Sequence, residues 1–396
     1  MYKRLCSRIF IAGYLAAALT SCVGTQPLSE ANLAVEPQTA TQAATAQAEQ
    51  EIAIETLVVT ETPTPAPTPT ESAQVESITK TTPEIDYAAV RPYEVGQIMI
   101  VMYHGLVETE AEEQTYQRSI NNFKNDLQVF YDRGFSLASM KDWLDNNICT
   151  AAGYTPLILT FDDGKPSAFS LEIRDGELLP VKDCAVDIMT KFAEEHPEFG
   201  NTAMFFVNQN PFNGEGTLAE RFKYLLDHGY EIGNHTMNHK LMSKMDAYEI
   251  QAEIGGIDKL IKESAPGYEP YALSYPFGER PMKDLYEYIL NGEWEGKAYN
   301  YKIAVRVGQS GAPSAVNRID FDSINVPRVR ASDNQDTDLG WMLRQYETNP
   351  GPRYISDGDP DRIAVPEEFA DNVDLDSLNG KELYIYNEKG DSCKEE

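Results

Sequence analysis

The chain has 396 residues, of which 42% are hydrophobic and 10% aromatic, and its formal net charge at pH 7 is -30. This apolar content is enough to bury a sizeable core, which excludes a chain that is disordered throughout. The acidic excess repels phosphate backbones and argues against sequence-independent binding of nucleic acids. Five scattered cysteines form neither a disulfide framework nor a paired zinc motif.

The first 22 residues have the pattern of an export signal. Three basic residues precede a short apolar stretch at 9–19, and a Leu-Thr-Ser-Cys sequence ends at Cys22. This ending resembles the lipobox of bacterial lipoproteins, in which the cysteine is acylated and becomes the new N-terminus. We therefore expect residues 1–22 to be a signal peptide with a lipobox and Cys22 to be a lipid anchor. A plain signal peptide or an uncleaved helix is the alternative.

Residues 23–96 are rich in Ala, Thr, Pro and Glu and are predicted to form a disordered linker, because they cannot bury enough apolar surface to fold. From residue 97 onwards, short apolar runs alternate with amphipathic stretches, which indicates an α/β domain at 97–346. The remaining residues, 347–396, are predicted to be an acidic C-terminal extension with one apolar run, Glu382–Tyr386, as an edge strand.

The alternation predicts a parallel sheet with crossover helices, closed or partly closed. The segment 165–182 interrupts it as an insertion. The expected strands are Ile98–Tyr103, Leu157–Phe161, Ala203–Val207, Glu231–Gly233, Tyr271–Ser274, Lys302–Val305 and Ser323–Val326. The expected helices are Ile120–Asp132, Ser139–Asn146, Ala185–Glu195, Leu218–His228, Ala247–Glu263 and Met282–Leu290.

Two adjacent carboxylates follow one of these strands. Asp162 and Asp163 come directly after the run Leu157–Phe161, at the C-terminal end of the expected strand. Parallel α/β proteins place their active sites at that end. A solvated turn is the alternative, because Asp-Asp-Gly is also favourable in tight turns.

Two histidines follow a later strand. His235 and His239 are four residues apart, which places both imidazoles on one face of a helical turn, as two ligands of one divalent metal require. Two exposed polar residues on a loop are the alternative. Together with Asp163 they form a two-histidine, one-carboxylate set, which leaves coordination positions for water and substrate. Asp162 is a candidate base beside this set.

These motifs resemble those of a known family. TFDDG at 160–164, HTMNH at 235–239 and SYPFG at 274–278 are similar to the first three motifs of the polysaccharide deacetylases, the NodB-homology domain of carbohydrate esterase family 4. The resemblance covers about 97–346. It implies a distorted (β/α) barrel of about seven strands that hydrolyses the N-acetyl group of a glycan containing N-acetylglucosamine (GlcNAc).

The resemblance also implies roles for individual residues. Asp163, His235 and His239 would hold a divalent metal, Asp162 would be the general base, and the backbone amide of Phe277 would stabilise the oxyanion. A bound divalent ion lowers the pKa of a water molecule and polarises the acetamide oxygen. Zinc is the expected ion, with cobalt, nickel or iron as alternatives, because the donor set accepts several divalent ions.

The third motif departs from the family pattern. It usually opens with an arginine that orients the base, and this chain has Ser274 instead. Arg328 follows an expected strand, and we expect it to take the place of the motif arginine. The alternative is that Arg328 and Arg330 are both surface charges.

The family's C-terminal histidine, which protonates the leaving amine, is also missing, since no histidine follows His239. His104, however, ends the first strand of the domain. Its surroundings resemble the opening strand of circularly permuted members, including poly-GlcNAc deacetylases, in which the acid comes from the N-terminal strand. A closed barrel can accept that strand from either chain end, so we expect His104 to be the catalytic acid. A structural histidine is the alternative.

The sequence therefore predicts an extracytoplasmic, metal-dependent polysaccharide deacetylase that is lipid-anchored to the bacterial cell membrane and monomeric. Its expected partners are an N-acetylated glycan and the membrane, with no nucleic acid. The alternative from another class is a glycan-binding lipoprotein that keeps the fold without turnover, motivated by Ser274 and the missing C-terminal histidine. The adjacent Asp162 and Asp163 argue against it, because a binder needs no base beside a metal ligand. The polymer, whether peptidoglycan, poly-GlcNAc or another, stays open.

Overall fold

The computed structural model describes residues 85–308, 311–333 and 335–393. The expected signal peptide, the anchor Cys22 and most of the expected linker lie outside these ranges. Within them, no helix is both long enough and apolar enough to span a bilayer.

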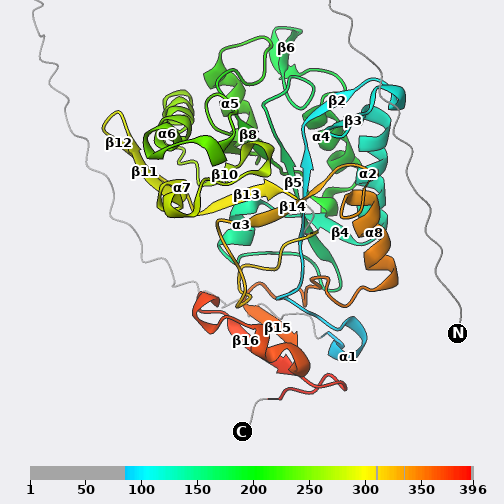
Figure 1. Ribbon diagram of the computed structural model, residues 1–396. Coiled ribbons are helices and arrows are strands. Elements are labelled where there is room, and N and C mark those ends of the chain that lie inside the picture. Colours follow the sequence, from blue (N-terminus) through cyan, green and yellow to red (C-terminus); the bar gives the residue numbers. More distant parts are fainter. Residues whose placement is uncertain (1–84, 309–310, 334, 394–396) are drawn as a thin grey trace, which may run out of the picture. The chain divides into compact units, whose positions relative to one another are not determined.

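Seven parallel strands form a closed barrel at the centre of the fold (Figure 1). The ring closes because β1 pairs with β14 on one side and with β5 on the other. An additional strand, β4 (Phe135–Leu137), pairs with the first half of β5. In order around the ring, the strands are β1 (Met99–Tyr103), β14 (Val326–Arg330), β13 (Ile303–Val307), β10 (Ala272–Ser274), β9 (Glu231–Asn234), β8 (Met204–Val207) and β5 (Thr155–Phe161). The predicted barrel of about seven strands is confirmed.

Helices surround the barrel, as Figure 1 shows, and each of the longer ones has a buried face. In α2, Ser119 caps the first turn by accepting from the Asn122 amide, and Phe123, Leu127 and Phe130 are fully buried. The longer helices are α2 (Ile120–Asp132), α4 (Ala185–Glu195), α5 (Leu218–Asp227), α6 (Ala247–Ser264) and α8 (Leu339–Thr348), and the short ones are α1 (Tyr87–Val90), α3 (Met140–Leu144) and α7 (Glu287–Leu290).

The alternation of side chains along the strands divides the core into two layers. Met99 and Val101 of β1 pack with the surrounding helices, whereas Ile100 of β1 and Ile98, directly before the strand, pack with Ile158 of β5 in a second apolar cluster. Because both faces of the strands are covered, the strands read as continuous apolar runs. Towards the C-terminal ends of the strands, polar residues replace apolar ones on this second face, and the candidate site lies there.

Several expected elements have different bounds. The last barrel strand is Val326–Arg330 and not Ser323–Val326, and the expected helix Met282–Leu290 is a 3-10 turn, Lys283–Leu285, followed by α7. Two antiparallel hairpins were not predicted, although each turns on a residue pair with positive φ, Asp175-Gly176 and Glu295-Gly296. These hairpins are β6 (Leu171–Arg174) with β7 (Glu177–Pro180), inside the insertion, and β11 (Asn291–Trp294) with β12 (Lys297–Asn300). A short parallel pair, β2 (Gly105–Val107) with β3 (Gln117–Ser119), also lies outside the barrel.

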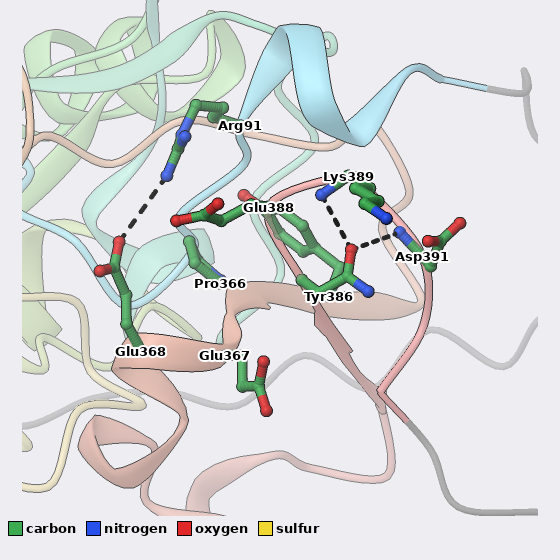
Figure 2. A pocket seen from close by; sticks show the side chains of 9 residues that line it. Arg91, Pro366, Glu367, Glu368, Tyr386, Glu388, Lys389 and Asp391 are labelled. Carbon is green, nitrogen blue, oxygen red and sulfur yellow. Dashed lines mark hydrogen bonds and ion pairs between the residues drawn. The ribbon is translucent and has the colours of Figure 1, made fainter.

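The C-terminal residues fold against the N-terminal part of the described chain. The expected edge strand at Glu382–Tyr386 is present as β16, but it pairs with β15 (Arg362–Pro366) in a separate two-stranded sheet and does not extend the barrel. A hollow of about 450 Å³ lies in this region, and Arg91 approaches Glu368 there to 3.7 Å. Figure 2 shows the side chains that line it. No residue of the three sequence motifs and no histidine lines this hollow, so it is distinct from the candidate site.

Candidate active site

Three of the residues singled out in the sequence converge at the C-terminal end of the barrel. Asp163 follows β5, and His235 and His239 follow β9. One Asp163 oxygen, Oδ1, lies 3.4 Å from His235 Nε2 and 3.5 Å from His239 Nε2. Ligand atoms that surround one tetrahedral ion at 2.0–2.2 Å lie roughly 3.3–3.6 Å from one another. The two Asp163–histidine distances therefore fit ligands of one divalent cation, and all three ligand atoms lie within 4.8 Å of one another.

The environment of His235 provides a separate test of this fit. The imidazole is buried, and its Nδ1 lies 2.9 Å from the Ser274 carbonyl oxygen, to which only a protonated nitrogen can donate. This tautomer leaves a lone pair on Nε2, which is buried without a hydrogen-bond partner. A buried polar atom without a partner is costly unless a ligand satisfies it. Histidine metal ligands typically donate the N–H of one ring nitrogen to a group such as a backbone carbonyl, which leaves the other ring nitrogen free to bind the metal.

Left-handed backbone conformations shape all three motif loops. Asp163, Thr236, His239 and Phe277 have φ values of 70°, 61°, 51° and 58°. Non-glycine residues adopt this region at a cost and are held there by their surroundings, often at functional sites. Gly164 is required beside Asp163, because an added Cβ would lie 2.5 Å from the Pro211 side chain.

Buried polar side chains hold the histidine loop in place. The Asn234 side-chain oxygen accepts from the Thr236 amide at 2.8 Å, between the two motif histidines. Glu253, from α6, accepts from the backbone amide of Asn238 at 2.7 Å and from its side-chain amide at 2.8 Å. The conformation of this loop is thus fixed by a carboxylate that does not itself reach the three-residue cluster.

Asp162 lies beside the cluster and forms a buried ion pair with Arg328. Arg328 donates from its two terminal nitrogens to the two Asp162 oxygens at 2.7 and 2.6 Å, and both side chains are at most 2% exposed. The Ser274 hydroxyl lies 3.2 Å from Asp162 and accepts from Arg328 at 2.8 Å. Burial alone would raise the pKa of Asp162, but the charges of Arg328 and His235 lower it to about 2. Asp162 is therefore ionised at neutral pH.

His104 lines the same small cavity, of about 220 Å³, as Asp162, His235 and Arg328. Its Nδ1 is buried without a hydrogen-bond partner, and its ring packs against Tyr116 with 5.1 Å between the ring centroids. Burial lowers the pKa of His104 below its usual value, although the two neighbouring carboxylates act in the opposite direction. The exposed ring of Phe277 also lines the cavity and packs against the His239 ring, with 4.6 Å between the ring centroids.

The structure thus brings together all seven of the candidate residues that lie within the described ranges. Their proposed roles stay predictions. Three further side chains of this region have only a limited signal in the sequence. Ser274 stands out only because it replaces the motif arginine, Glu253 is one acidic residue among several on an amphipathic helix, and Tyr116 lies in a polar segment without a motif.

Comparison with known proteins agrees with the motifs. Residues 152–290 match the family model described as polysaccharide deacetylase. A chitin deacetylase of Arthroderma benhamiae is 26% identical over 161 residues, which are 39% of this chain and 38% of the relative. The match therefore spans well under half of that curated relative.

Solved structures of deacetylases superpose on part of the chain. A Streptococcus pyogenes deacetylase in complex with acetate is 20% identical, with a TM-score of 0.46, over 63% of this chain and 97% of that one. A polysaccharide deacetylase from Bacillus cereus is 18% identical, with a TM-score of 0.45, over 64% of this chain and 68% of that one.

The three motifs at 160–164, 235–239 and 274–278 all lie within the matched segment, residues 152–290, which is similar to polysaccharide deacetylases. This segment contains Asp162, Asp163, both motif histidines and Phe277, whereas His104 and Arg328 come from β1 and β14 on either side of it.

Proposed function

We propose that this protein is a metal-dependent hydrolase that removes N-acetyl groups from a GlcNAc-containing polysaccharide at the cell surface. The observation that carries the proposal is the buried pair of Asp162 and Arg328 placed beside the Asp163, His235 and His239 cluster. This arrangement supplies an ionised carboxylate that is separate from the residues able to hold a cation.

Asp163, His235 and His239 would hold the divalent ion. When bound, the ion acts as a Lewis acid, which polarises the acetamide oxygen and makes a water molecule more acidic. Asp162 accepts the proton of the attacking water, and the two hydrogen bonds from Arg328 hold its carboxylate in one orientation. The water oxygen forms a bond to the acetamide carbon, the carbon–nitrogen bond breaks, and the products are acetate and a free amine.

The leaving amine needs a proton, and His104 is placed to donate it. His104 lines the same cavity as the motif histidines, and its buried Nδ1 is not engaged by another side chain, so the ring can donate a proton to the amine when it is itself protonated. The Phe277 backbone amide is proposed to stabilise the oxyanion, since Phe277 lines the same cavity in a left-handed turn. A side chain at the following residue, Gly278, would lie 2.4 Å from the Val307 carbonyl oxygen, so only glycine allows this turn.

Three finer features of the proposal come from the sequence. Zinc is the proposed ion, because two imidazoles and one carboxylate form a typical catalytic zinc set. The proposed location is the outer face of the cell membrane, with Cys22 as the lipid anchor. We propose a monomer whose partner is an N-acetylated glycan.

A glycan-binding protein without turnover is less consistent with the site. That alternative depends on the motif arginine being replaced by Ser274. Arg328 reaches Asp162 from β14 with a bidentate contact, and Ser274 joins the same hydrogen-bond network. The base is thus oriented although its usual partner is missing from the third motif.

The test measures acetate release from GlcNAc oligomers by the protein loaded with zinc, with and without chelator. Asp163→Ala and His239→Ala should lower both bound metal and acetate release by at least 100-fold. Asp162→Asn should abolish acetate release while metal content stays at the wild-type level. The proposal fails if these variants keep wild-type activity, or if the wild-type protein binds oligomers and releases no acetate.

A further inference from the structure

Each of the two motif histidines directly follows an asparagine. The sequence at 234–239 is Asn-His-Thr-Met-Asn-His, so Asn234 precedes His235 and Asn238 precedes His239. Both asparagines are tied to α6. Asn238 is held by the α6 carboxylate described above, and Asn234 donates from its side-chain nitrogen to the Ile254 carbonyl oxygen at 2.8 Å. Each histidine is thus held in place at the residue before it.

The side chain of Asn234 uses both its oxygen and its nitrogen. The residue is fully buried at the end of β9. Its oxygen accepts from the Thr236 amide, and its nitrogen donates to the Ile254 carbonyl oxygen and, at 2.7 Å, to the Tyr301 hydroxyl. Only one orientation of the side-chain amide places an oxygen against a backbone N–H and a nitrogen against a backbone carbonyl. These contacts therefore fix the side chain in that orientation.

Tyr301 extends this anchor to a charged pair on α6. It lies between β12 and β13 and is 2% exposed. Because its hydroxyl oxygen accepts from Asn234, the single hydroxyl hydrogen is free to donate, and it does so to Oδ1 of buried Asp258 at 3.2 Å. The other Asp258 oxygen, Oδ2, lies 3.0 Å from Lys262 Nζ. A continuous chain of contacts therefore runs from a partly exposed lysine to the residue before His235, and hydrogen bonds in such chains strengthen one another.

The histidine loop needs such an anchor because its backbone is strained. Thr236, directly after His235, is β-branched and has a φ of 61°, a conformation that persists only where the surroundings enforce it. The hydrogen bond from its amide to Asn234 is one of these constraints. The Thr236 hydroxyl oxygen is buried without a hydrogen-bond partner and adds no further one. If Asn234 lost its orientation, Thr236 could relax, and the His235 ring would move relative to Asp163.

We propose that Tyr301 and Asp258 are positioning residues, which set the affinity for the metal by holding His235 in place through Asn234. None of these three anchoring side chains lines the catalytic cavity, so they act through the loop and not on the substrate. Tyr301 also lies outside the segment that matches the family model and belongs to none of the three motifs. The inference rests on the proposed function, in which His235 would hold the ion.

The experiment measures the zinc affinity of the full chain by titration against a competing chelator. Tyr301→Phe removes the hydroxyl and keeps the ring. We expect the affinity to fall about tenfold, at the lower end for residues that orient metal ligands, and kcat for acetate release to return at saturating zinc. Asp258→Ala should cause a similar loss of affinity. Asp258→Asn keeps an oxygen that can accept from the Tyr301 hydroxyl, so its affinity should stay within about threefold of wild type.

Tyr299→Phe is the matched control. Tyr299 is also 2% exposed, and its ring centroid lies 5.9 Å from that of Tyr301. Its hydroxyl, however, donates to the Tyr288 carbonyl oxygen in α7 and not to the histidine loop. Because each variant removes one buried hydroxyl from the same cluster, chemical denaturation should show similar losses of stability. The zinc affinity of Tyr299→Phe should equal that of the wild type.

Equal losses of zinc affinity in the two tyrosine variants would mean that the hydroxyls act only through stability, and the proposal would be wrong. It would be equally wrong if Tyr301→Phe kept the wild-type affinity. A wild-type protein that binds zinc but releases no acetate contradicts the proposed function alone, because the affinities still decide the role of Tyr301. A wild-type protein that binds no zinc contradicts both.

Discussion

The two ends of β1 carry two buried polar clusters of opposite character. Before β1, Glu94 accepts from the amides of Ala364 and Asp357 and from the hydroxyls of Ser356 and Tyr354, at 2.8 to 3.3 Å. After β1, His104 Nδ1 and His235 Nε2 are buried without a hydrogen bond, although Asp163 Oδ1 lies 3.4 Å from His235 Nε2. One cluster is saturated with hydrogen bonds, and the other contains ring nitrogens that form none.

This difference separates a structural network from a functional one. The Glu94 cluster joins the C-terminal residues to the start of the barrel, and its hydrogen bonds are all internal. The cluster at the opposite end keeps two imidazole nitrogens without hydrogen bonds and four left-handed residues, and both features cost stability. Polar groups that are buried but unsatisfied are expected where a ligand or an ion completes the set.

The largest expected effect is that of Arg328→Met, which leaves the Asp162 carboxylate buried without its charge partner. We expect a loss of about 3–5 kcal/mol in the free energy of unfolding and a loss of at least 100-fold in kcat. Chemical denaturation and acetate release measure the two effects. Arg330→Met, which breaks the ion pair with Asp338 instead, is the control and should lose at least tenfold less activity. Equal losses in the two variants would contradict a specific role for Arg328.

Glu253→Gln should have the next largest effect, because it replaces one of the two carboxylate oxygens that hold Asn238 by an amide donor. We expect metal affinity to fall about 10–100-fold, as for other residues that orient metal ligands, and excess zinc to restore kcat. Metal titration followed by spectroscopy gives the affinity. Glu263→Gln, on the exposed face of the same helix, should leave the affinity unchanged. Failure of excess metal to rescue the variant would indicate a role other than positioning.

Ser274→Ala removes one hydroxyl from the Asp162 and Arg328 pair and keeps the two charge-assisted contacts. The expected cost is about 2 kcal/mol of stability and a several-fold decrease in kcat, since the hydrogen bonds that Ser274 makes with Asp162 and with Arg328 are both lost. A decrease as large as that of Arg328→Met would mean that the serine, and not the arginine, fixes the base. Steady-state kinetics on the two variants distinguishes these outcomes.

The smallest effect on activity is expected at the other end of β1. Burial, together with the nearby Asp357 carboxylate, raises the pKa of Glu94 above its usual value. The folded chain then holds this proton to a higher pH than the unfolded chain, so the free energy of unfolding falls as the pH rises above about 4.3. Glu94→Gln should flatten this part of the stability profile and leave kcat unchanged. A steeper profile, or a loss of acetate release, would contradict the structural assignment.

The sequence was sufficient for the parts of the molecule that depend on local patterns. Continuous apolar runs predicted the barrel strands, and motif spacing predicted the convergence of Asp163, His235 and His239. Strand alternation also accounts for the buried position of Arg328. Val326 and Arg328 point to the same face of β14, and Val326 belongs to the second apolar cluster.

Features that depend on contacts between distant segments could not be predicted in this way. The hydroxyl of Ser274 has a role only because Arg328 arrives from another strand, which no local pattern indicates. The position of Tyr116 over His104 depends on the parallel pairing of β2 with β3. The hairpin at Asp175-Gly176, by contrast, is indicated by the sequence itself, because an Asp-Gly pair favours a two-residue hairpin turn.

The closure of the barrel by β1 has a consequence for dissecting the domain. A fragment restricted to residues 152–290 would contain the metal-binding set but would lack β1 beside β5 and β13 beside β10, and so would present two open sheet edges to solvent. It would also be without the groups proposed to orient the base and to protonate the amine. The shortest fragment that contains every group of the proposed mechanism therefore runs from β1 to β14, a unit more than one and a half times the size of the matched segment.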